Sequence, residues 1–161
     1  MTNPKEIIVK SVLDSWNVRI HQTDELFNKL TDEQLQREVA PGKNRGIYLL
    51  GHLTAVHDRM LPLLGFEQQL YPQLTDAFLN KPDKAVLEIP PAKELRVYWK
   101  DVNEKLAKHF TDLPIDGWFE KHTSVTAEDF VKEPHRNRLN VVLGRTGHLA
   151  YHAGQLIFLK N

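Results

Sequence analysis

The sequence lacks cysteine altogether, so neither a disulfide bridge nor a protein thiol can take part in its structure or chemistry. It also lacks an excess of either charge, because 21 Lys and Arg residues balance 21 Asp and Glu residues. Such a chain has no overall positive field to attract nucleic acid or an anionic membrane surface. Its apolar runs stay below the roughly 18 residues that cross a bilayer, and we find no targeting signal. We therefore expect a cytoplasmic protein with no nucleic-acid and no membrane partner.

Long stretches of alternating polar and apolar residues, which would indicate a sheet, are also lacking. The apolar residues recur instead at spacings of three and four, which is typical of amphipathic helices. The connections between the second and third helices and between the third and fourth are long. We therefore expect an all-α fold with one domain over residues 1–161, a four-helix bundle. The predicted helices cover about residues 4–30, 44–64, 91–112 and 137–160.

The most informative feature is a pair of histidines, His148 and His152, in a helix-compatible run near the C-terminus. Residues four apart lie about one turn apart on the same helical face, so both imidazoles can bind one divalent metal. The alternative is that they are hydrogen-bonded core residues, as histidines on packed faces often are. Leu149 stands where the helical zinc-protease motif has its glutamate base, so a protease of that kind is disfavoured.

A metal site in a helical bundle takes ligands from different helices, so a third ligand should lie on another apolar helical face. His52 lies on the apolar stripe of the second predicted helix and is the best-placed candidate. His57 lies about 140° further around that helix, also has apolar neighbours, and remains a competitor. The remaining histidines sit among polar residues or in predicted loops, and we interpret them as surface residues: His21, His109, His122 and His135.

Three glycines, Gly144, Gly147 and Gly154, form a stripe beside the histidine pair, although each costs a helix about 1 kcal/mol relative to alanine. We expect a neighbouring helix to approach closely along this stripe and bring its imidazole within reach. Tight helix packing without any metal is the alternative explanation.

The one local excess of positive charge precedes the histidine pair. We interpret it as solvated charge at a helix start, and the alternative is a collar that attracts an anionic substrate; its members are Lys132, Arg136, Arg138 and Arg145. No catalytic residue is evident. Asp58 and Tyr151 are within helical reach of the site, but surface charge and aromatic packing explain them equally well. Gln155 either orients His152 or a ligand, or is a surface amide.

The segments Gly51-His52-Leu53, Pro90 to Leu95 and Gly147 to Gln155 resemble the DinB-like (YfiT-like) superfamily of metalloenzymes over nearly the whole chain. The resemblance implies a four-helix bundle of up-down-down-up topology, often dimeric, so a homodimer is expected. It also implies that one histidine of the second helix and the pair of the fourth bind a divalent metal, which carries over to His52, His148 and His152. Zinc or nickel is the expected metal, with iron and manganese as alternatives.

Three neutral imidazoles would leave the metal with open positions, as in catalytic rather than structural sites. The resemblance implies a metal-dependent enzyme that acts on a small molecule. Two reactions follow from it: a transfer or isomerisation that uses a low-molecular-weight thiol, and a metal-assisted hydrolysis. The alternative is a helical bundle that binds a metal or small ligand without catalysis.

Overall fold

The computed structural model describes residues 3–160, and the expectation of an all-α fold is confirmed. Within that range no strand forms, and two isolated bridges join Glu38 to Arg45 and Lys121 to Asn137. No helix in the described part of the chain is both long enough and apolar enough to cross a membrane. The elements are α1 (Pro4–Lys29), α2 (Asp32–Leu35), α3 (Gly46–Asp58), α4 (Met60–Leu63), η1 (Asp76–Asn80), α5 (Ala92–Asp112), η2 (Ile115–Phe119), α6 (Ala127–Lys132), α7 (Arg138–Leu156) and η3 (Ile157–Lys160).

The ends of the long helices follow from local side-chain chemistry. Asn3 accepts a hydrogen bond from the backbone N–H of Lys5 at the start of α1, and Asn137 accepts one from the backbone N–H of Asn140 at the start of α7. The second predicted helix is divided, because α3 ends at Asp58 and α4 follows it. Pro62 explains the division, since it has no N–H to donate to the carbonyl of Asp58 and its ring crowds that carbonyl.

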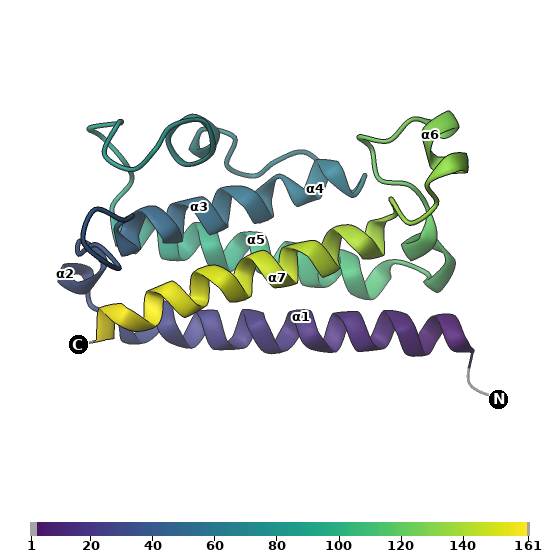
Figure 1. The fold of residues 1–161 in the computed structure, drawn as a ribbon, viewed down its shortest axis with the longest axis horizontal. Helices are drawn as coiled ribbons and strands as arrows, with labels where there is room; N and C mark the ends of the chain where they lie inside the picture. Colours follow the sequence, from purple (N-terminus) through teal and green to yellow (C-terminus); the bar gives the residue numbers. More distant parts are fainter. Residues whose placement is uncertain (1–2, 161) are drawn as a thin grey trace.

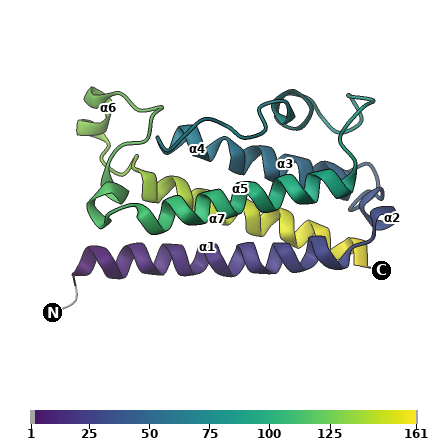
Figure 2. The same ribbon diagram turned by 180° about the vertical axis from the view of Figure 1, so that it is seen from behind.

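Four long helices lie side by side (Figure 1). In that view α1 and α7 run from right to left, whereas α3 and α5 run from left to right. α1 packs against α7, α3 packs against α5, and α3 also contacts α7. α5 lies on the opposite side from α7, as the view from behind shows (Figure 2). The contact between α3 and α7 places their histidines on adjacent helices.

α3 is the most deeply buried helix, since 11 of its 13 residues are buried. Buried apolar side chains form two clusters along the molecule. One includes Leu50, Phe78 and Trp99, and the other includes Trp16 and Trp118. Helix α3 therefore offers a fixed backbone from which a side chain can be placed accurately.

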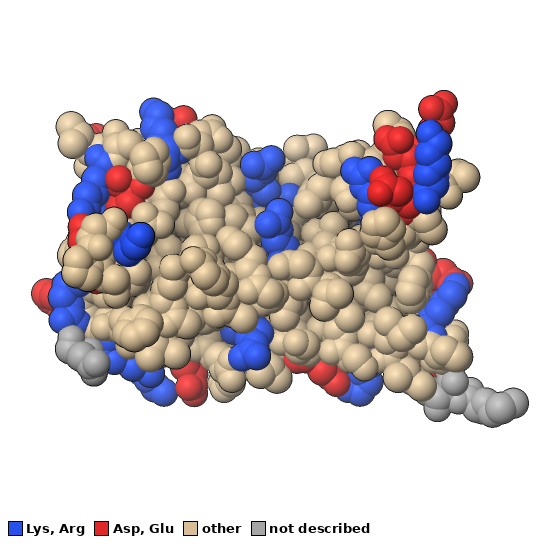
Figure 3. Space-filling model, in the orientation of Figure 1, with Lys and Arg blue, Asp and Glu red and all other residues tan. Residues whose placement is uncertain are grey.

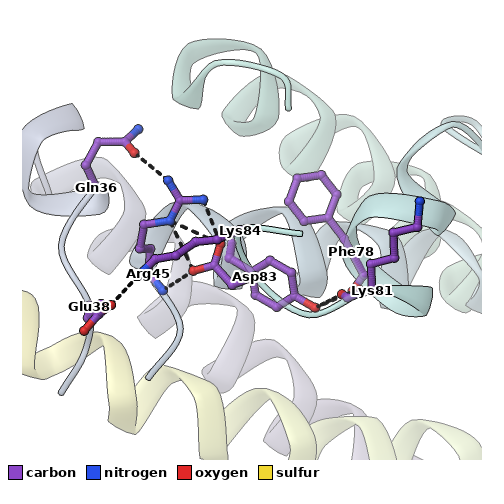
Figure 4. Close-up of polar contacts among 8 residues, drawn as sticks. Gln36, Glu38, Arg45, Phe78, Lys81, Asp83 and Lys84 are labelled. Atoms are coloured by element: carbon purple, nitrogen blue, oxygen red, sulfur yellow. Dashed lines mark hydrogen bonds and ion pairs between the residues drawn. The ribbon is translucent and has the colours of Figure 1, made fainter. Parts of the chain in front are cut away.

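The loop after η1 is anchored to the start of α3 (Figure 4). The Asp83 carboxylate accepts hydrogen bonds from the backbone N–H of Arg45 at 2.8 Å and from its guanidinium Nη2 at 2.7 Å. Burial opposes the charge on Asp83, but these bonds outweigh it and hold the carboxyl pKa below its usual value. The Tyr48 hydroxyl donates to the carbonyl oxygen of Lys81 at 2.8 Å. Both contacts hold the preceding residues of η1 against α3.

The element η1 approaches α3 closely at Gly51, where the ring of Phe78 packs directly against the glycine. A Cβ at this position would overlap the ring. The expectation of close packing along Gly144, Gly147 and Gly154 is wrong, because a Cβ at each would have no described atom within 4 Å apart from its chain neighbours and the backbone of its own helix. These three glycines lie on the outer side of α7, and the third imidazole approaches from another side.

The contrast between the two kinds of glycine can be tested by alanine substitution. Gly51→Ala should lower the free energy of unfolding by about 1–3 kcal/mol, because the Phe78 ring must move in a packed core. Gly144→Ala, the matched control, should raise it by about 0.5–1 kcal/mol, since alanine favours a helix and meets no obstruction. Urea unfolding of both variants measures the difference. Equal stability of the two variants would contradict the packing described for Gly51.

Candidate metal centre

Three imidazoles converge where α3 meets α7. His148 Nε2 lies 3.2 Å from His52 Nε2 and 3.1 Å from His152 Nε2. Two ligand atoms at 2.1 Å from one tetrahedral ion are about 3.4 Å apart, so these separations are close to those of a shared metal. Among the residues described, these three form a group that can hold a metal ion. The structure thus brings together the three histidines that the sequence singles out.

The ring of His52 is oriented by the backbone of η1. Its Nδ1 lies 2.8 Å from the carbonyl oxygen of Phe78, which can only accept, so Nδ1 carries the proton. In a neutral imidazole this leaves Nε2 with a free lone pair, directed at the cluster. The ring of Tyr48 stacks nearly parallel to His52, with centroids 6.1 Å apart and an interplanar angle of 11°. The tautomer that metal binding needs is therefore fixed by the fold.

His152 is oriented in the same way by Gln155. The distance from His152 Nδ1 to Gln155 Oε1 is 2.7 Å, and an amide oxygen accepts hydrogen bonds. Nδ1 therefore donates and Nε2 again presents its lone pair to the cluster. This contact supports the first of the two interpretations of Gln155, that it orients His152.

His148 lies between the other two rings and provides a test of whether a cation fits. Its Nδ1 is buried and has no hydrogen-bond partner within residues 3–160. Its Nε2 faces the lone pairs of both neighbouring imidazoles, which repel one another unless a proton or a cation lies between them. A single N–H on His148 Nε2 cannot point at both neighbouring lone pairs at once, so it relieves their repulsion only in part. A divalent cation between the rings is attracted to all three nitrogens. The donor set fits a divalent metal.

All three imidazoles are held in the neutral form. Burial lowers the pKa of His148 to about 4, with further contributions from His152, His52 and the positive charge of Arg145. Burial is also the largest cause that lowers the pKa of His52 and of His152, against the opposing hydrogen bonds of Phe78 and Gln155. None of the three rings therefore has a positive charge to lose at neutral pH before the cluster binds a cation, although His148 must carry its one proton on Nδ1.

A pocket of about 510 Å³ opens beside two of the three imidazoles, a size suited to a small ligand. Its wall combines α3, α4, η1, α7 and the loops that follow α4 and η2. Within the described chain no Asp or Glu lines it. The lining residues are His52, Val56, Arg59, Pro62, Leu63, Gln69, Leu79, Thr123, Arg145 and His148.

His57, the competing candidate, lies elsewhere in the core. Its ring sits between Trp16 and Trp99, with centroid distances of 4.8 and 4.9 Å. Its side chain is fully buried, and its Nδ1 donates to Asn103 Oδ1 at 2.8 Å. His57 is therefore a packed core residue and does not converge with His148 and His152, whereas His52 does.

The candidate bases have structural or surface roles. Asp58 is not a surface charge, because it is fully buried and accepts backbone hydrogen bonds from Leu70 and Tyr71 at 2.7 and 2.9 Å. Tyr151 is 65% exposed and points away from the core. His109, which the sequence assigned to the surface, is partly exposed, and its Nε2 lies 2.6 Å from a carboxylate oxygen of Glu67.

The basic residues before the histidine pair do not act as one group. Arg136 pairs with Glu133 at 3.0 Å, and Arg138 pairs with Glu120 at 2.7 Å while it also donates to backbone carbonyls. Of the four basic residues before the histidine pair, only Arg145 lines the pocket.

Sequence reasoning missed two groups of the site, the carbonyl of Phe78 and the side chain of Arg59. The carbonyl has no sequence signal, since any residue carries that group. Arg59 did have a signal, because it lies seven residues, about two helical turns, after His52, whereas Arg145 was already among the basic residues that the sequence singled out.

His57 makes a testable contribution to acid stability. Burial lowers its folded-state pKa from 6.5 to about 3. Below pH 6.5 the unfolded chain takes up a proton that the folded chain does not. This one residue should therefore lower the free energy of unfolding by about 1.4 kcal/mol per pH unit at most as the pH falls toward 3. His57→Phe should reduce the pH slope between 6 and 4 by up to one proton, measured by urea unfolding of metal-free protein. An unchanged slope would contradict the assignment.

Comparison with known proteins supports the family resemblance. The family model described as the DinB superfamily matches residues 16–156, which include all three converging histidines. A separate comparison of the chain with curated proteins finds no match. Since the match covers most of the chain and includes both helices of the histidine cluster, the chain belongs to the DinB superfamily.

Proposed function

We propose that this protein is a metal-dependent enzyme that transfers a low-molecular-weight thiol to a small electrophilic substrate at His52, His148 and His152. The convergence of three neutral imidazole nitrogens beside an open pocket carries the proposal. A structural metal site is commonly closed by four protein ligands, whereas three protein ligands leave a position for a reactant. Membership of the DinB superfamily agrees with a metal at this place.

The bound ion, which we propose to be zinc or nickel with iron and manganese as alternatives, would supply a Lewis acid that favours the thiolate form of a thiol or the hydroxide form of water. The chain contributes the fixed orientation of the imidazoles. Phe78 holds the proton of His52 on Nδ1, and Gln155 does the same for His152. Because the chain has no cysteine, the thiol must come from a small molecule.

Metal-assisted hydrolysis is the second candidate reaction. Such enzymes commonly use a carboxylate beside the metal as a general base. No carboxylate lines the pocket within residues 3–160, and Asp58 is committed to backbone N–H groups. Thiol transfer needs no such base once the thiolate forms, so it remains our first choice. A non-catalytic bundle that binds metal or a small ligand is the third reading.

The finer features of the fold and assembly belong to the same proposal. We propose a single-domain four-helix bundle of up-down-down-up topology, which the directions of α1, α3, α5 and α7 in Figure 1 support. We also propose a cytoplasmic homodimer. The outer side of α7 and the adjoining η3 support dimerisation, because Leu143 and Tyr151 on α7 and Phe158 on η3 are all more than half exposed.

The reaction can be tested with zinc-loaded protein, the thiol 2-mercaptoethanol and the fluorogenic electrophile monochlorobimane. We expect conjugation at least about tenfold above the rate without protein, because each 1.4 kcal/mol of transition-state stabilisation gives that factor. His148→Ala should lose the acceleration, whereas His57→Phe, the matched control, should keep it. Hydrolysis of p-nitrophenyl acetate, measured in parallel, reports the second reaction.

The outcomes separate the three readings. If the protein hydrolyses the ester in a His148-dependent way but does not conjugate the thiol, hydrolysis would replace thiol transfer as the proposed reaction. A metal-loaded protein that accelerates neither reaction would contradict the enzyme proposal and favour the non-catalytic bundle.

A further inference from the structure

Two arginines line the pocket beside the histidine cluster. Arg59 follows the last residue of α3, and Arg145 lies on α7 one turn before His148. Figure 3 shows basic side chains at the centre of this face, over α3 and α7, with no acidic side chain beside them. The pocket thus combines metal-ligand chemistry with a concentration of positive charge.

Neither guanidinium is used by the fold. The side chains of Arg59 and Arg145 form no hydrogen bond and no ion pair with any residue from 3 to 160. Arg45, Arg96 and Arg138 differ, because each donates to a carboxylate and helps to hold a loop or helix in place. A guanidinium group has five N–H donors in a planar fork. Two guanidinium groups without protein partners therefore leave many N–H donors free to bind a ligand.

The two arginines also lie near each other and near the histidines. The charge of Arg59 is one cause of the lowered pKa of Arg145, after burial, and Arg145 in turn contributes to the lowered pKa of His52 and His148. Along α7 the rise from Arg145 to His148 is about 4.5 Å. A molecule of a few heavy atoms can therefore contact Arg145 and the histidine cluster at once.

Other polar groups of the pocket are already occupied. The Thr123 hydroxyl donates to the carbonyls of Pro62 and Leu63 at 3.1 Å, and the Gln69 amide nitrogen faces Asp58 and Thr75. The free donors of the pocket are therefore mainly those of the two arginines. The positive charges of the exposed Arg59 and the half-buried Arg145 repel each other, and a bound anion would offset that repulsion.

We propose that Arg59 and Arg145 bind the carboxylate of the substrate that reacts at the histidine cluster. This assignment rests on the proposed function and adds a substrate class to it, a small molecule with a carboxylate beside its reacting atom. A guanidinium pairs with a carboxylate through two parallel N–H donors, which fixes the direction of the rest of the molecule. The carboxylate belongs either to the thiol or to the electrophile that accepts it.

The first experiment uses metal-free protein, so that it stands apart from the metal proposal. Sodium propionate is titrated into ¹⁵N-labelled protein, and the Nε–Hε signals of the arginines are followed by NMR, with propionamide as the neutral comparison. We expect a saturable shift of the Arg59 and Arg145 signals with propionate alone. In Arg145→Gln the dissociation constant for propionate, obtained from the Arg59 signal, should rise at least about tenfold. This is the loss of affinity expected when one charged hydrogen-bonding partner is removed.

Arg136→Gln is the matched control, because it removes the same charge from the same part of the chain but from a surface ion pair. It should leave the propionate affinity unchanged. The absence of a saturable shift in the unaltered protein, or equal weakening by Arg136→Gln, would overturn the assignment.

The second experiment identifies which reactant carries the carboxylate. Cobalt-loaded protein is titrated with 3-mercaptopropionate and with its neutral analogue 3-mercaptopropanol, and the cobalt absorbance gives the two dissociation constants. A preference of about tenfold for the acid, lost in Arg145→Gln, would place the carboxylate on the thiol. With propionate binding established, equal affinities would place it on the acceptor. Failure of the protein to take up cobalt would count against the metal proposal alone, since the metal-free experiment still decides on the arginines.

Discussion

The hydrogen bond from His52 Nδ1 to the carbonyl oxygen of Phe78 is the contact on which the histidine cluster depends. Without it the half-buried ring of His52 could rotate or carry its proton on Nε2, and the lone pair would no longer face His148. Gly51 permits the bond, because its missing side chain leaves room for the Phe78 ring against α3. A backbone group in a loop thereby controls the chemistry of a side chain on a helix.

Several contacts away from the cluster help to hold the two partners of this hydrogen bond in place. The ion pair of Arg45 with Asp83 and the hydrogen bond of Tyr48 to the Lys81 carbonyl hold the loop that carries Phe78 (Figure 4). The deep burial of α3 keeps the other partner in place. The precision of the cluster therefore comes from packing and loop anchoring together, as binding sites on rigid elements require.

His52 and His57 show how position decides the use of a histidine. They lie five residues apart on one helix, so their side chains point in different directions. His52 faces α7 and a pocket, whereas His57 is enclosed by two tryptophans and is held neutral by burial. One residue type thus packs the core at one position and presents a ligand atom at the other.

Much of this arrangement could be predicted from local sequence patterns. The spacing of apolar residues predicted the long helices, and the four-residue spacing of His148 and His152 predicted that their rings would meet. The role of Phe78 could not be predicted, because it depends on where a long loop packs. The glycines of α7 misled the prediction, since a small residue signals an open face as readily as a close approach, and only tertiary contacts distinguish the two.

The arginines are an intermediate case. Their helical spacing from the histidines was visible in the sequence, and Arg136 pairs with Glu133 only three residues away. The ion pair of Arg138 with Glu120 and the place of Arg145 in the pocket, however, arise from tertiary structure. A count of charged residues along the chain could not distinguish the arginine that lines the pocket from those held in ion pairs.

The most direct test of the central claim is elemental analysis of protein purified without a metal-affinity tag. We predict about one divalent metal ion per chain, lost in His52→Ala and His148→Ala and retained in His57→Phe, because the first two residues face the cluster and the third faces the core. No metal above background after addition of zinc or nickel, or loss of metal in His57→Phe alone, would contradict the claim that these three imidazoles form a metal centre.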